Sequence, residues 1–172
     1  QLKGQAISAR GHLERRDSNG RWVTVWDRSL VNDVAPVDVV VAPSGRTVAT
    51  FDNWHFVGRG ENVLVFYGPD GELLRSLKLS DLLPEYYISA LPHSVSSTRW
   101  RKDPRFAADG RLVIPIVQPA DDWSDTSRTV ELTVDPLSGA VTPISPERWA
   151  TALDAARRVA AQKDDADRKT RA

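Results

Sequence analysis

The sequence contains no cysteine, no methionine and no long hydrophobic run, and its charges cancel. Without cysteine there can be no disulfide, thiolate metal site or cysteine nucleophile. No stretch approaches the roughly 18 apolar residues of a membrane-spanning helix, so we expect no membrane span. The 23 basic and 23 acidic side chains give no net field that would attract nucleic acid or an anionic membrane, so we expect neither as a partner.

The missing methionine bears on processing because the chain begins at Gln1. Removal of a signal peptide and a shortened expression product would each explain it. We expect a periplasmic or secreted protein, with a cytoplasmic one as the alternative. At 172 residues the chain has the usual length of a single domain.

Turns that end in glycine are the clearest local signal. Glycine adopts the positive φ angles that tight hairpins require, and Asp, Asn or Ser can bond the turn backbone. Strand-favouring residues flank each of these turns, which predicts antiparallel hairpins. One flanking strand, residues 112–117, contains Pro115 and is expected at a sheet edge or at a bulge. The turns are residues 17–20, 43–45, 68–71, 108–110 and 135–139.

The hairpins repeat along the chain. Residues 45–48 align with residues 110–113, and residues 64–66 align with residues 132–134. Each unit therefore has four strands, a to d, and residues 5–28 are expected to form a preceding c–d pair.

At this level the sequence resembles a known class of repeat. Residues 41–50 and 62–73 resemble one blade of a β-propeller protein, and the resemblance covers residues 37–79 closely and 97–143 loosely. A closed ring needs at least four blades, and only two and a half fit. We therefore expect an all-β protein of four-stranded meanders, arranged as an open arc or sandwich, or a part of a larger propeller.

Two segments interrupt the β pattern. Residues 80–92 begin with a capping serine and end at proline, which predicts one or two short helical turns. Ser145 and Pro146 are a typical helix start, and an apolar stripe follows. We expect a β-meander domain over residues 1–144, an amphipathic helix over 145–162 and a charged, disordered tail over 163–172.

Two loops between the second and third strands of each unit are the candidate binding surface. Both combine tryptophan with acids, and loops at one end of a rigid β scaffold often bind partners. The alternative is that Trp54 and Trp123 fold back onto the core. The residues expected to bind are Asp52, Asn53, Trp54, His55, Arg59 and Trp123, with Tyr86, Tyr87 and Trp100 from neighbouring segments.

Metal binding and catalysis are weaker alternatives. Asp121, Asp122 and Asp125 could supply carboxylates to Ca²⁺, although the EF-hand spacing is absent. No other cofactor is expected. The histidines show no metal-ligand spacing, and no nucleophile-elbow motif accompanies them.

We expect a non-enzymatic module that recognises a protein partner, for example an exported inhibitor or immunity-type protein. A hydrolase or carbohydrate-active domain using the loop carboxylates and His55 is one alternative. A fragment of a larger β-propeller surface protein is another. Oligomeric state is left open.

Overall fold

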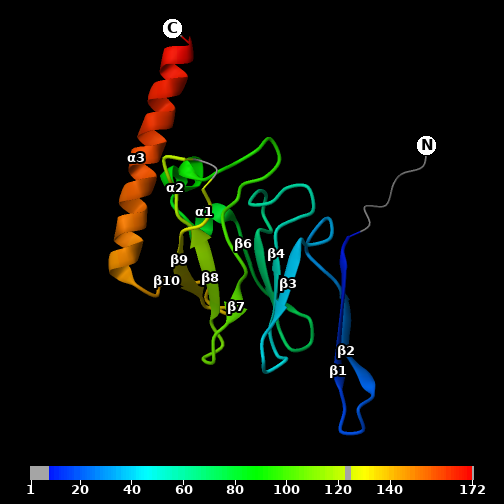
Figure 1. Ribbon diagram of the computed structural model, residues 1–172. Coiled ribbons are helices and arrows are strands. Elements are labelled where there is room, and N and C mark those ends of the chain that lie inside the picture. Colours follow the sequence, from blue (N-terminus) through cyan, green and yellow to red (C-terminus); the bar gives the residue numbers. More distant parts are fainter. Residues whose placement is uncertain (1–7, 123–124, 172) are drawn as a thin grey trace, which may run out of the picture.

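The computed structural model describes residues 8–122 and 125–171, in which ten strands form three antiparallel sheets (Figure 1). The first sheet is a hairpin, and the other two have four strands each. Short helices and one long helix complete the described part. The elements are β1 (Arg10–Arg16), β2 (Trp22–Ser29), β3 (Asp38–Val41), β4 (Val48–Phe51), β5 (Leu64–Tyr67), β6 (Leu73–Leu77), α1 (Leu79–Leu82), α2 (Glu85–Ala90), β7 (Arg105–Phe106), β8 (Leu112–Val117), β9 (Thr129–Val134), β10 (Val141–Pro143) and α3 (Pro146–Arg171).

The hairpin turns are those that the sequence predicts. All five turn glycines have positive φ, between +67° and +82°. The turn before Gly139 shows how the flanking acid helps: Asp135 Oδ1 accepts hydrogen bonds from the backbone N–H of Leu137 at 2.9 Å and of Ser138 at 2.7 Å. Such bonds hold the turn with the side chain of its own first residue.

The predicted repeat and fold class are confirmed. The orders β3-β4-β5-β6 and β10-β9-β8-β7 are the same meander, and β1–β2 precedes them as a lone pair. No closed barrel or propeller is present over residues 8–122 and 125–171. The expectation for Pro115 is wrong, because β8 lies inside its sheet with an unbroken register to β9. Proline is tolerated there because β7 pairs with β8 only at Leu112 and Val113.

The helices fall where the sequence places them, but the last one is longer than expected. Helix α2 lies within the predicted segment 80–92, and helix α1 begins one residue before that segment. Helix α3 starts at Pro146 and runs on to Arg171, where we expected a tail from residue 163. Lys163 Nζ donates to the carbonyl oxygen of Ser89 at 2.9 Å, which ties this part of α3 to the end of α2. Within the described residues, no helix has both the length and the hydropathy for crossing a bilayer.

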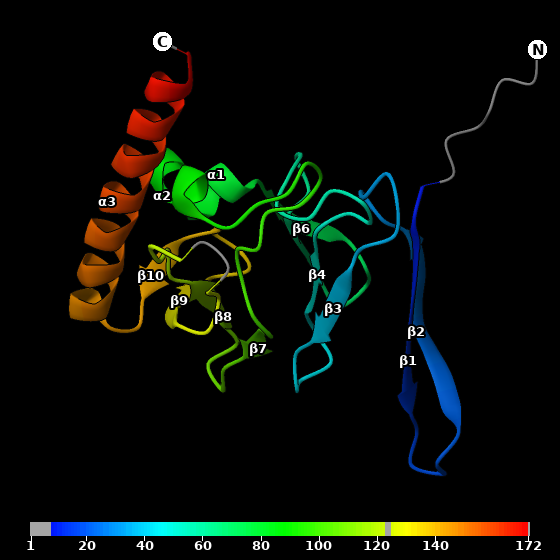
Figure 2. The ribbon, with the colours of Figure 1, turned by 45° about the horizontal axis from the view of Figure 1, so that its top comes forward.

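The elements stand in layers, with α3 on one side, the two four-stranded sheets in the middle and the β1–β2 hairpin on the other side (Figure 2). Strands β4 and β5 are buried on both faces, which explains their continuous apolar sequences. Phe51 and Phe66 point into the larger core, which the second sheet and the helices share. Val65 and Tyr67 point the other way, into a smaller core beneath the hairpin.

Candidate functional site

The loop between β4 and β5, residues 52–62, is anchored by a buried carboxylate. Asp52 follows directly on β4, is fully buried and has φ of +57°. Its Oδ1 accepts hydrogen bonds from the backbone N–H of Gly58 at 2.6 Å and from the Trp100 indole N–H at 3.0 Å. The Asp52 carboxylate thus bridges the first half of the loop, from residue 52 to Gly58. It also joins this loop to Trp100, which precedes the second four-stranded sheet.

Arg101 extends this anchor between the two units. Its guanidinium lies 3.2 Å from Asp38 Oδ2 and 3.3 Å from Asp52 Oδ2, and its side chain is only 10% exposed. The same group lies 4.1 Å from the centre of the Phe51 ring. Cation–π contact and two charge-assisted hydrogen bonds offset the cost of enclosing the charge. We call Asp52, Trp100 and Arg101 the anchor cluster.

Burial sets the protonation behaviour of Asp52. It raises the pKa of this carboxyl, and the hydrogen bonds from Gly58 and Trp100 together with the charge of Arg101 oppose the rise. At the exposed turns hydrogen bonds dominate over burial, so the Arg111 side chain lowers the pKa of Asp109 and the bonds from Ser138 lower the pKa of Asp135. Desolvation penalises the charged form, whereas donors favour it.

The carboxyls are therefore expected to titrate in a fixed order, with Asp109 and Asp135 below their ordinary pKa and Asp52 above it. Because the folded-state pKa of Asp52 is raised, its contribution to stability is full below its ordinary pKa and falls as pH rises through the raised value. The contributions of Asp109 and Asp135 are lost as pH falls. Carboxyl-carbon NMR across the acidic range measures all three, and an Asp52 that titrates with the turn residues would contradict this reading of its burial.

The anchored loop presents apolar side chains to solvent. Trp54 is 58% exposed, Phe56 56% and Val95, from a neighbouring loop, 95%. His55 is also exposed, has φ of +79° and lies edge-on to the Trp54 ring at 5.5 Å. We call Trp54, His55, Phe56 and Val95 the end patch.

The two loops of the end patch are fixed to each other by hydrogen bonds from the Arg59 side chain and from a backbone N–H. The Arg59 guanidinium donates to the carbonyl oxygens of Val95 at 2.7 Å and Ser94 at 3.0 Å. The Thr98 N–H donates to the Val57 carbonyl oxygen at 2.9 Å. The exposed apolar side chains are therefore held on loops whose conformation is set by the fold.

The predicted binding residues differ in where the structure places them. Trp54 and His55 are exposed in the end patch, and Asp52, Asn53 and Arg59 support it; Asn53 Oδ1 accepts from the Asn32 amide at 3.0 Å. Trp100 is fully buried in the anchor cluster. Trp123 lies outside the described residues.

The two tyrosines lie on α2 and contact side chains of α3. Tyr87 is fully buried, its ring lies 5.2 Å from that of Trp149, and its hydroxyl donates to the Val117 carbonyl oxygen at 3.0 Å. Tyr86 is half-buried with the Arg157 guanidinium over its ring at 5.0 Å. These contacts make the pair part of the helix packing.

A small cavity of about 230 Å³ lies beside the first candidate loop, where Asp52 and Val57 line it. Thr126 lines it from the β8–β9 connection, one residue after the second candidate loop, residues 119–125. The described residues contain no group of three His, Asp or Glu side chains that could hold a metal ion, so Asp121, Asp122 and Asp125 form no such cluster. Asp125 instead accepts from the N–H and hydroxyl of Ser127.

The Asp52 carboxylate is not placed to act as a general base or as a nucleophile. Each of its hydrogen bonds goes to Gly58, Trp100 or Arg101, and His55 points into solvent. A general base must reach the proton that it removes, and a fully buried carboxylate with its acceptors occupied does not.

Sequence reasoning missed Phe56, Val95 and Arg101. Phe56 lies in the candidate loop and could have been included with Trp54. Val95 stands among serines with no local signal, and Arg101 is paired with a carboxylate 49 residues away. No protein-family model, no curated protein and no solved structure matches this chain.

Proposed function

We propose that this protein is a non-enzymatic binding module that recognises a protein partner through the end patch. The observation that carries the proposal is the exposure of Trp54, Phe56 and Val95 on loops that the anchor cluster holds in place. Several large apolar side chains are thus exposed on two loops that are bonded to each other, which favours an interaction surface. Tryptophan is among the residues that dominate binding energy in such surfaces.

The fixed loops support the proposal energetically. Association costs free energy when loops must be ordered, and pre-ordered loops avoid that cost. Positive φ at Asp52 and His55 costs free energy too, and the surrounding bonds must offset it. The partner surface we expect is apolar, with an acceptor or acidic group placed for His55. Inhibitors and immunity-type proteins are one class of such modules.

Serine at positions 54 and 56 together is expected to weaken partner recognition without loss of folding. The partner is first captured from the native host's extract and identified, and its affinity for each purified variant is then measured by calorimetry. Trp54→Ser with Phe56→Ser should weaken binding at least about tenfold, because hot-spot side chains dominate affinity. The free energy of unfolding should change by less than about 1 kcal/mol, because both side chains are exposed.

Leu137→Ser is the matched control. Leu137 is also exposed, but it lies in the β9–β10 turn, at the opposite end of the sheets from the end patch. Affinity equal to wild type in the double serine variant, or a comparable loss in Leu137→Ser, would refute the end patch as the binding surface.

A further inference from the structure

The β1–β2 hairpin covers only part of the sheet on which it packs. Trp26 and Leu30 of the hairpin segment contact Val48 of β4 and Val65 and Tyr67 of β5 in the smaller core. Strand β3, at the edge of the same sheet, contributes no side chain to that core. The face of β3 on the hairpin side is therefore left open.

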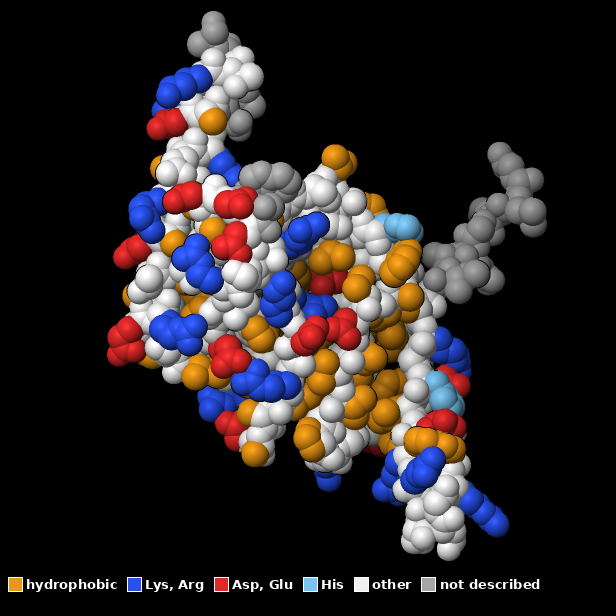
Figure 3. All heavy atoms as spheres, in the orientation of Figure 1, with side chains coloured by type: hydrophobic (Ala, Val, Ile, Leu, Met, Phe, Trp, Pro, Cys, Tyr) orange, Lys and Arg blue, Asp and Glu red, His pale blue; other side chains and the backbone are white. Residues whose placement is uncertain are grey.

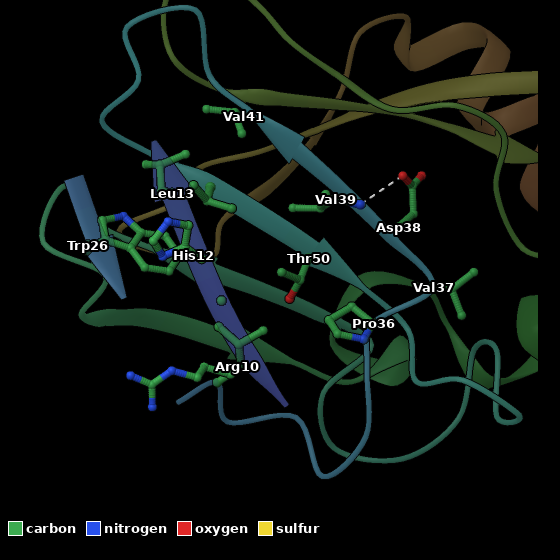
Figure 4. Close-up of a pocket in the computed structure, with 13 residues that line it drawn as sticks. Arg10, His12, Leu13, Trp26, Pro36, Val37, Asp38, Val39, Val41 and Thr50 are labelled. Atoms are coloured by element: carbon green, nitrogen blue, oxygen red, sulfur yellow. Dashed lines mark hydrogen bonds between the residues drawn. The ribbon is translucent and has the colours of Figure 1, made fainter. Parts of the chain in front are cut away.

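An apolar groove of about 430 Å³ lies where this cover ends, between β1 and β3. Val39 is 57% exposed and Val41 42%, and Figure 4 shows both extending from β3 towards the side on which Leu13 of β1 lies. Apolar side chains gather on this face of the molecule in Figure 3. Two β-branched side chains on one strand face thus lack the cover that Val48 and Val65 have.

Strand β1 borders the groove with a free edge. Within residues 8–122 and 125–171, β1 pairs only with β2, so its other edge offers unpaired backbone groups. Its inward-facing residues, Gly11 and Leu13, are half-buried. On its outward face His12 and Arg10 contact Asp27, which makes that face polar. An occupant must therefore be apolar towards β3 and polar towards solvent.

We propose that this groove binds an extended segment of a separate polypeptide, which adds to the free edge of β1 and covers Val39 and Val41. Backbone hydrogen bonds to the edge would supply affinity, and alternate small or branched apolar side chains would fill the groove. The repeat supports an extended occupant. Within the described residues, the strand that corresponds to β1 in each four-stranded sheet has a further strand on the edge that β1 leaves unpaired. In the first of these sheets that place is held by β4, which pairs in turn with β3.

A second copy of this chain fits the groove less well than a separate segment. Pairing β1 with β1 of another copy would place a two-fold axis perpendicular to the hairpin sheet. Both copies lie on the same side of that joined sheet, and each has β3 projecting beyond β1. The β3 strands of the two copies would then clash with each other.

A peptide with the sequence of residues 36–52 tests the proposal, because it carries the strand pair that holds this place in the complete unit. Labelled at its N-terminus, it is titrated with the full chain and followed by fluorescence anisotropy. We expect saturable binding. Val39→Lys and, separately, Val41→Lys should each weaken it at least about tenfold, because an ammonium group would face an apolar strand.

Two controls separate strand addition from general stickiness. Leu73→Lys alters a similarly exposed residue on β6, the other edge strand of the same sheet, and should leave binding unchanged. The peptide N-methylated at alternate residues keeps its side chains but cannot pair at the edge, and it should bind at least about tenfold more weakly. Thermal unfolding of each variant confirms that it is folded.

Three outcomes would overturn the proposal. They are no saturable binding at millimolar peptide, equal binding by Val39→Lys and Val41→Lys, or a concentration-dependent dimer that Val39→Lys dissociates. The inference does not rest on the end patch: the Trp54→Ser, Phe56→Ser variant should bind the peptide as wild type does. Failure of one proposal is thereby distinguished from failure of the other.

Discussion

Replacing Asp52 with alanine is expected to lower the free energy of unfolding by about 3–5 kcal/mol, because it breaks a buried ion pair and leaves buried donors without an acceptor. Gly58 N–H, Trp100 Nε1–H and the Arg101 guanidinium all lose this partner. Arg101 would keep only Asp38 as an anion. Urea unfolding followed by tryptophan fluorescence measures the loss.

Two further variants show where the effect comes from. Position 52 has a left-handed backbone, which is unfavourable for alanine but which asparagine, like aspartate, tolerates. Asp52→Asn therefore isolates the charge and should cost less than Asp52→Ala. Asp154→Ala removes an exposed carboxylate 2.7 Å from Arg157 and should cost less than about 0.5 kcal/mol. Equal losses for Asp52→Ala and Asp154→Ala would disprove the anchor.

The neighbouring tyrosines of α2 are expected to differ sharply on truncation. Tyr87→Ala should lower the free energy of unfolding by about 3–5 kcal/mol, as other buried aromatic truncations do. Tyr87 is fully buried against Trp149, and its hydroxyl is bonded to Val117. Tyr86→Ala should cost about 1 kcal/mol, because that side chain is half-buried and its cation–π contact with Arg157 is at the surface.

Tyr87→Phe separates packing from hydrogen bonding in the same position. It keeps the ring and removes only the hydroxyl, so it should cost about 1 kcal/mol and leave the Val117 carbonyl without this donor. Chemical denaturation of the three variants under one set of conditions gives the comparison. A larger loss for Tyr86→Ala than for Tyr87→Ala would mean that α2 packs on α3 through the other face.

The residues of the anchor cluster and of the end patch lie close together in the sequence, but the first are buried and the second are exposed. Asp52 is enclosed while Trp54 and Phe56 project into solvent. A change in the anchor should therefore alter recognition only by disordering the loop, whereas a change in the end patch should alter recognition directly. Unfolding measurements on every binding variant distinguish these two effects.

The sequence by itself determined the local structure of this protein. The turns at Gly45 and Gly110, the four-stranded units that contain them and the helix start at Pro146 all follow from backbone preferences acting over a few residues. Strand-favouring residues beside the turns also predicted β4 and β5 as strands. Even so, Pro115 shows the limit, because whether its strand is an edge depends on how far β7 extends.

Only the tertiary structure decided which side chains are buried and which remain available. Trp100 and Trp54 have the same chemistry, yet one is enclosed beside Asp52 and the other is exposed. Arg101 meets Asp52 across 49 residues, and the open face of β3 exists because the hairpin stops short of it. Burial depends on which surfaces meet after the chain folds back, and that is set by packing between distant segments, which local preference and periodicity do not encode.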